Sequence, residues 1–212
     1  MKRIIDVSIP IGPGMLTYPG DPTVSLDRTM DMEAGEIANL SLLSMSTHTG
    51  THVDPPIHYV ADGLTIDEVP LDVLVGDAVV VDVRGAGAID ARELSRSGIS
   101  SGSRRVLFRT DWSERWAEAA PVFPDSYTAV TVDGAAWLIE HNVDLVGTDF
   151  ISIEGDDDET FPVHRALLGS GIIVVEGLDL RGVEPGTYGF ACLPMKLRRG
   201  DGGPARAILF AD

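Results

Sequence analysis

Short runs of apolar and β-branched residues recur along the chain and predict a protein rich in β-strands. With 23 glycines and 13 prolines among 212 residues, much of the remaining chain is expected to form turns. We expect strands over residues 4–9, 40–45, 78–83, 105–109, 144–147, 172–176, 188–193 and 205–210.

Four segments between these strands carry helical patterns. The expected helices cover residues 90–97, 113–119, 133–141 and 163–168. Asp90 and Asp133 stand where a helix needs a capping side chain. Ala136, Leu138 and Ile139 would face inward from the helix that Asp133 begins.

Strands outnumber helices and do not alternate with them regularly. This order favours a mixed α/β fold over a doubly wound parallel sheet, with a mixed or barrel-like sheet at its centre and helices outside. No internal repeat or long linker divides the sequence, so we expect one domain over residues 1–212.

The chain is strongly acidic, because 16 basic and 33 acidic side chains give a net charge of −17. Such a surface repels phosphate backbones and anionic lipids, which argues against nucleic-acid and membrane partners. The acidic stretch EGDDDET, residues 154–160, lacks the spacing of a calcium loop and predicts a solvated loop.

A single cysteine, Cys192, excludes an intramolecular disulfide, and its apolar neighbours indicate a buried, inert thiol. The N-terminal residues do not resemble a signal peptide, and no apolar run is long enough to cross a bilayer. We therefore expect a cytoplasmic protein.

Candidate chemistry concentrates in the segment HTGTHVDPPIH, residues 48–58, which holds three of the five histidines. Gly50 and the pair Pro55-Pro56 argue against a helix, so this segment is expected to be extended. At this point a metal site and a histidine-rich turn without a metal both fit the pattern.

In an extended chain, His48, His52 and Asp54 share the same parity and would point to one side. A straight strand would separate the Cα atoms of His48 and His52 by roughly 13 Å, too far to share an ion comfortably. The chain must therefore bend between them, and Gly50 is the residue that permits it. Two imidazoles and a carboxylate suit Zn²⁺, with Mn²⁺ as the main competitor.

Two further side chains could complete such a site. Glu176 ends the apolar strand GIIVVEG, where a carboxylate is costly unless it is paired or metal-bound. His164 begins the helix that precedes this strand. Either one could instead be a solvated residue at the end of its element. The remaining histidine, His141, fits a cation near a helix C-terminus.

The segment 48–58 is similar to the H-x-G-T-H-x-D-x-P-x-H signature of the cyclase-like metal-dependent hydrolases, a family that includes bacterial kynurenine formamidases and isatin hydrolases. The resemblance extends over nearly the whole chain and implies a swivelling β/β/α fold that commonly forms dimers or larger homo-oligomers. Further stretches that look like their family counterparts, in order, are TYPGDP, FRTDWSERW, GTDFISIEG, LPMKL and GGPARAIL.

The resemblance also implies a binuclear centre with two Zn²⁺ ions per chain, or Mn²⁺ in some members. Position by position, His48, His52 and Asp54 would bind the first ion. Asp54 and Glu176 would bridge the two ions, and His164 would complete the second.

Around this centre the resemblance assigns supporting roles. His58 would donate and accept protons, which suits an imidazole because it titrates near neutral pH. Tyr18 stands where kynurenine formamidases typically carry a tryptophan against the aromatic substrate, although it could equally be a core aromatic. Asp149 and Ser152 would support the site from behind, and residues 110–112 would line the mouth of the pocket.

The function expected from these residues is metal-dependent hydrolysis of a small aromatic amide. The best single candidate is an arylformamidase acting on N-formylkynurenine in tryptophan breakdown. Another lactam or cyclic amide, such as isatin, is the first alternative. A metal-stabilised binding protein without catalysis is the second, although a bridging carboxylate pair and a free His58 argue against it.

Overall fold

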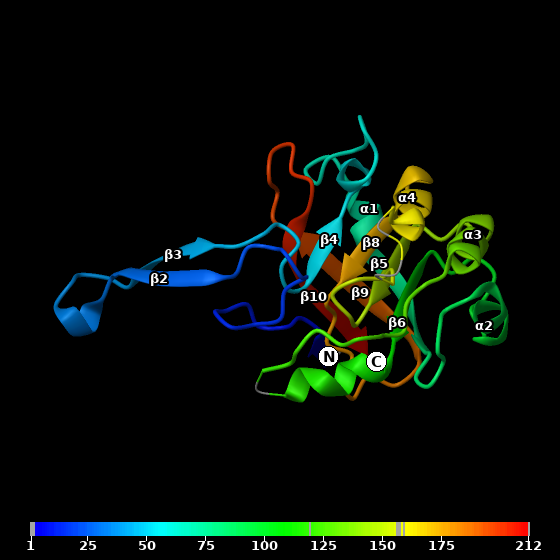
Figure 1. Ribbon diagram of the computed structural model, residues 1–212, viewed down its shortest axis with the longest axis horizontal. Helices are drawn as coiled ribbons and strands as arrows, with labels where there is room; N and C mark the ends of the chain where they lie inside the picture. The colour runs from blue at the N-terminus through cyan, green and yellow to red at the C-terminus, as the bar shows by residue number, and fades with distance from the viewer. Residues whose placement is uncertain (1–2, 119, 156–157, 159, 212) are drawn as a thin grey trace.

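The computed structural model describes residues 3–118, 120–155, 158 and 160–211 and is dominated by strands (Figure 1). The strands are β1 (Arg3–Asp6), β2 (Ser25–Met30), β3 (Leu40–Ser44), β4 (His52–Asp54), β5 (Val75–Asp82), β6 (Arg105–Arg109), β7 (Leu145–Thr148), β8 (Ile173–Glu176), β9 (Gly186–Pro194) and β10 (Gly203–Ala211). The α-helices are α1 (Leu71–Leu74), α2 (Ala91–Arg96), α3 (Val132–Glu140) and α4 (Pro162–Gly169). Short 3₁₀ helices cover Met32–Ala34, Pro56–His58 and Asp111–Ala117.

Within the described residues, seven strands close into a barrel in the order β10-β4-β8-β7-β6-β5-β9. Closure comes from β9, which pairs with β5 on one side and with β10 on the other, while β1 extends the sheet beyond β10. The pairs β5–β6, β6–β7 and β7–β8 are parallel, and the other pairs in this sheet are antiparallel. The predicted mixed α/β fold with a barrel-like core is confirmed.

The barrel strands separate two apolar cores. Along β6, Leu107 packs with the cluster that fills the barrel, whereas Val106 and Phe108 pack with the cluster beneath the helices. Helices α2, α3 and α4 lie together along this outer face (Figure 1). Because both faces of the parallel strands are covered, these strands read as continuous apolar runs.

The predicted inert thiol is also confirmed. Cys192 is fully buried inside the barrel, and burial raises its pKa to about 12. Among the described helices, none combines the length and apolar character that a membrane span requires.

Two details of the helix prediction were wrong. Helix α3 is capped by Thr131, whose hydroxyl accepts a hydrogen bond from the backbone N–H of Gly134 (3.2 Å), so Asp133 lies in the first turn instead. This shift turns Ala135 inward and leaves Ala136 exposed, while Leu138 is buried as predicted. Asp90 does cap α2, accepting a hydrogen bond from the N–H of Glu93.

Strands β2 and β3 pair only with each other and project away from the barrel as an arm, residues 25–44 (Figure 1). Strand β2 was not predicted, because its sequence SLDRTM mixes polar and apolar residues without burying a face. The arm exposes apolar side chains, which are Leu26, Met32, Ile37, Leu40, Leu42 and Leu43.

Candidate metal centre

The histidine segment forms a tight turn followed by a short strand. Gly50 adopts a left-handed backbone (φ 72°), so the chain bends between His48 and His52 as the sequence predicted. The turn is locked in place by Thr51, whose hydroxyl donates to the carbonyl of Gly177 (2.6 Å) and accepts from the N–H of Ile9 (2.9 Å).

Pairing of β4 with β8 brings Glu176 next to the candidate ligands of the histidine segment. His52 lies opposite Glu176 in this register, and His52 Nε2 is 3.3 Å from Glu176 Oε2 and 3.4 Å from Asp54 Oδ1. His52 Nδ1 donates a hydrogen bond to the carbonyl of Gly50 (2.9 Å), which leaves Nε2 to face the two carboxylates.

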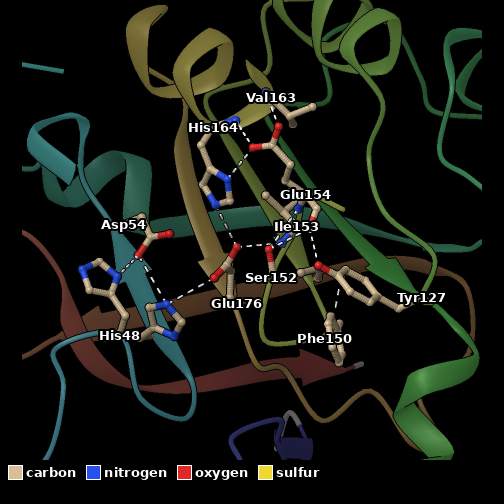
Figure 2. A network of polar contacts seen from close by, with 12 residues as sticks. His48, Asp54, Tyr127, Phe150, Ser152, Ile153, Glu154, Val163, His164 and Glu176 are labelled. Carbon is tan, nitrogen blue, oxygen red and sulfur yellow. Dashed lines mark hydrogen bonds and ion pairs between the residues drawn. The ribbon is translucent and has the colours of Figure 1, made fainter. Parts of the chain in front are cut away.

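His48 approaches the same carboxylate from the turn. Its Nδ1 donates to Asp54 Oδ1 (2.7 Å), and its ring meets the His52 ring edge-on at 5.3 Å (Figure 2). Gly202 gives this ring its space, because a Cβ at that position would lie 2.5 Å from His48 Cε1. The structure therefore brings together all three ligands that the segment was expected to provide.

His164 completes the cluster from α4. Its Nε2 lies 3.2 Å from Glu176 Oε1, and its Nδ1 donates to Glu154 Oε2 (2.7 Å), so the ring lies between two carboxylates (Figure 2). The backbone N–H of Ile153 donates to Glu176 Oε1 (2.7 Å) and holds that carboxylate in place.

Glu154 is a buried member of this cluster that the sequence analysis missed. It was assigned to a solvated acidic loop, but its side chain is only 4% exposed and faces His164. Asp158 is exposed as expected, and residues 156, 157 and 159 lie outside the described residues. The sequence offered one signal: Glu154 is the first acidic residue after the apolar run FISI.

Opposite charges determine the ionisation of this cluster. Burial alone would lower the pKa of His52, but Asp54 and Glu176 outweigh it and raise the pKa to about 9. Burial likewise opposes protonation of His164, and Glu154 with Glu176 raise its pKa to about 10. Despite burial, the pKa of Asp54 is held well below its usual range by the neighbouring histidines. The buried carboxylates thus need positive charge beside them, and in the metal-free protein protonated His52 and His164 supply it.

Two overlapping groups have the spacing of metal ligands. His52, Asp54 and Glu176 each offer a ligand atom within 4.8 Å of the others, and so do His48, Asp54 and His58. Three buried atoms of this cluster have no hydrogen-bond partner in the described structure: His48 Nε2, His52 Nε2 and Asp54 Oδ2. Ring nitrogens and carboxylate oxygens that have no hydrogen bond can offer their lone pairs to a divalent cation between them.

His58 lies at the wall of the cluster. The 3₁₀ helix that follows Pro55 stacks its ring on His48, with 3.9 Å between ring centroids and 23° between planes. Burial lowers the pKa of His58 to about 4, below the near-neutral range expected from the sequence, so the ring is neutral at pH 7.

The cluster forms the floor of a cavity of about 140 Å³. Tyr18 lines the cavity and packs edge-on against Phe123 (5.5 Å between centroids). Tyr59, which the sequence analysis did not single out, lines it too and stacks on His164 (5.0 Å, 29°). The other lining residues are Asp21, Ser46, Ile151, Ser152 and Phe161.

Two secondary expectations came out differently. Ser152, which was expected to support the site from behind, lines the cavity. Asp149, expected beside it, instead accepts hydrogen bonds from Thr110 and Ser113 and so anchors the 3₁₀ helix Asp111–Ala117. Residues 110–112 line a separate surface pocket rather than this cavity, because that anchoring turns them away. His141 ends α3 as expected and donates from Nδ1 to the carbonyl of Trp137 (2.7 Å).

Comparisons with known proteins show which family the chain belongs to. Residues 5–155 match the family described as putative cyclase. The kynurenine formamidase of Erythrobacter litoralis (strain HTCC2594) is 38% identical, over 98% of this chain and 94% of that protein. The solved structure of a potential metal-dependent hydrolase with cyclase activity has a TM-score of 0.85 and 34% identity, covering 100% of this chain and 99% of that one. Isatin hydrolase A from Ralstonia solanacearum has a TM-score of 0.80 and 26% identity, covering 100% and 92%.

Proposed function

The chain belongs to the cyclase family of metal-dependent hydrolases, and on this premise we propose that it hydrolyses the C–N bond of a small aromatic amide, with N-formylkynurenine as the substrate. The observation that carries the proposal is the buried cluster of imidazoles and carboxylates at the floor of an aromatic-lined cavity. The similarity to a kynurenine formamidase over nearly the full length of both chains supports the choice of substrate.

We assign two divalent cations, Zn²⁺ or Mn²⁺, to this cluster. His48, His52 and Asp54 would hold the first. Asp54 and Glu176 would lie between the two, and His164 would hold the second. The orphaned atoms of the cluster and the mixture of imidazole and carboxylate donors support this assignment. Once bound, the ions would acidify a water molecule and polarise the substrate carbonyl.

His58 is the side chain that we assign to proton transfer. Its ring lies 6.2 Å from that of His164, measured between centroids, and lines the cavity where the scissile amide must lie. A neutral imidazole there can take a proton during attack and return it to the leaving amine. The competing role is that of a further ligand, since His58 also comes within ligand spacing of His48 and Asp54.

The aromatic walls suit a flat substrate. Tyr18, Tyr59 and Phe161 line the cavity together with Ile151, and an aryl ring between them would bury apolar surface while its amide points toward the cluster. Tyr18 carries a hydroxyl that can donate and accept a hydrogen bond, where a tryptophan would offer only an indole N–H donor. This difference from the kynurenine formamidases is the observation that favours the second candidate, a lactam such as isatin.

A substrate panel tests the proposal. The metal-loaded protein is incubated with N-formylkynurenine, isatin and formanilide at equal concentrations, and product formation is followed by absorbance. We expect N-formylkynurenine to have the highest kcat/KM. Hydrolysis of isatin alone would select the lactam hydrolase, and no turnover of any of the three would favour a metal-binding protein without amidase activity.

Two further proposals concern the oligomeric state and the location of the protein. We infer that copies of the chain assemble into a homodimer or tetramer, because a two-stranded arm that exposes six large apolar side chains is not stable on its own in water. We also propose a cytoplasmic location, with which the single buried thiol of Cys192 is compatible.

A further inference from the structure

The carboxylate of Glu154 lies on the side of His164 that faces away from Glu176. It accepts three hydrogen bonds: from the N–H of Val163 (2.7 Å), the N–H of His164 (2.9 Å) and the ring Nδ1 of His164 (2.7 Å) (Figure 2). Three donors from two consecutive residues thus converge on one buried side chain.

The backbone that carries Glu154 is itself held from two sides. Its carbonyl accepts hydrogen bonds from the hydroxyls of Tyr127 (2.7 Å) and Ser152 (2.8 Å). The preceding N–H, that of Ile153, donates to Glu176. One short segment, residues 152–154, therefore orients both side chains assigned to the second cation, Glu176 through the backbone and His164 through the Glu154 carboxylate.

Helix α4 needs this carboxylate at its start. Phe161, at the cap position, has a left-handed backbone (φ 49°) and provides no side-chain hydrogen bond, and Pro162 has no N–H. Glu154 takes over the capping of the first free N–H groups, and its negative charge is favourable at the helix N-terminus. Because the same carboxylate binds the ring, the direction of the imidazole is tied to the position of the helix.

The hydrogen bond also selects which ring nitrogen is available. A carboxylate accepts only, so Nδ1 of His164 keeps its proton and Nε2 is the atom that points to Glu176. We propose that Glu154 is a positioning residue for the second cation, setting the tautomer and direction of His164 so that Nε2 can bind it. This inference rests on the proposed function, because it assumes a cation at His164.

The test compares Glu154→Gln with Glu140→Gln, an equivalent change on the exposed last residue of α3. Metal-free protein is titrated with Co²⁺, and bound ions and the visible spectrum are recorded. For E154Q we expect one ion bound as in wild type and the second bound 10- to 100-fold more weakly, with an altered spectrum at the second step. Excess metal should restore kcat. E140Q should match wild type.

The outcomes separate this inference from the proposed function. A wild-type chain that binds no metal would contradict the proposed function. If wild type and E154Q bind both ions equally tightly with the same spectra, Glu154 has no positioning role. Lower thermal stability with unchanged binding of both ions would mean that Glu154 only caps α4, and would also overturn the inference.

Nitrogen NMR on the wild-type protein keeps the inference testable if E154Q does not fold. With ¹⁵N-labelled histidine, the metal-loaded protein should show a protonated Nδ1 and a metal-bound Nε2 for His164. A metal-bound Nδ1 in that ring would overturn the proposal, since Glu154 then could not be its hydrogen-bond acceptor.

Discussion

His58 is the residue whose role can be tested most cleanly by substitution. His58→Ala is expected to lower kcat by about 10²–10⁴-fold, the usual contribution of a general acid–base group, because the ring is neutral at pH 7 and lines the cavity. Metal content should stay at the wild-type level. Loss of a metal ion from the variant would show instead that His58 is a ligand.

His52 and His164, each paired with buried carboxylates, predict that the stability of the metal-free protein depends on pH. Burial opposes protonation of His52 and His164, yet nearby carboxylates raise their pKa values to about 9 and about 10, from 6.5. From pH 6.5 up to these raised pKa values, the folded state holds protons that the unfolded state has released. The folded state is therefore stabilised in full below pH 6.5, and this stabilisation is lost as the pH rises through the raised pKa values. The expected loss in free energy of unfolding is on the order of a few kcal/mol.

Urea unfolding of chelator-treated protein at several pH values from about 6.5 to about 10 measures this effect. The Zn²⁺-loaded protein is the control and should not show the same fall, because a cation replaces the protons between the carboxylates. A metal-free protein that becomes more stable across this range would contradict the assigned ion pairs.

At the residue scale, the sequence was informative where chemistry depends on local spacing. The bend at Gly50 and the approach of His48, His52 and Asp54 were predicted from their spacing, whereas the role of His58 came from the family resemblance. Glu154 escaped notice because its burial depends on strand pairing and on helix α4 eight residues later, which no local pattern reveals.

At the scale of elements, the centre depends on a close approach between the turn at Gly50 and the end of β8. Gly177 has φ 69°, and a Cβ there would lie 2.4 Å from the carbonyl oxygen of Gly50. Gly177→Ala is therefore expected to destabilise the fold by more than the ~1–2 kcal/mol typical of left-handed strain. It should also weaken metal binding, because Glu176 is the preceding residue.

Gly182→Ala is the matched control for this prediction. Gly182 has nearly the same backbone (φ 66°), but a Cβ there would meet no atom within 4 Å. Chemical unfolding and metal titration of both variants separate backbone strain from the clash. Equal effects of the two substitutions on stability and metal affinity would contradict the role given to the close approach.

The predicted elements match the structure best where one face or both faces of the element are buried. Strand β6 was predicted with its observed bounds because its central residues, Val106, Leu107 and Phe108, form a fully buried apolar run. The cap of α3 was misplaced because Thr131 and Asp133 are both good capping residues. Val130 pairs through its backbone with Ile89 and Glu154, and this pairing places the start of the helix at Thr131.

At the scale of the whole molecule, the arm is expected to determine assembly. Ile37, 90% exposed near the arm's tip, and Leu42, 60% exposed on β3, are available to a partner. The double variant Ile37→Asp and Leu42→Asp should shift the protein to monomers in light scattering coupled to size exclusion, because a charge at an apolar interface is costly. Val132→Asp, an exposed apolar position on α3, is the control. An unchanged mass for the arm variant would contradict this assignment.

The barrel itself was anticipated only in outline. The order of strands and helices indicated a mixed sheet, but closure requires β9 to pair with β5, which lies more than 100 positions earlier in the chain. The arm could not be foreseen either, since its strands lack the buried face that periodicity detects.

The central claim is that this chain uses bound divalent cations to hydrolyse an aromatic amide. The most direct measurement is a titration of metal-free protein with Zn²⁺ in which bound ions and hydrolysis of N-formylkynurenine are followed in the same samples. We predict two ions per chain, no hydrolysis without metal, and activity that rises with occupancy. Full activity in the metal-free protein, or complete absence of Zn²⁺ binding, would contradict the account.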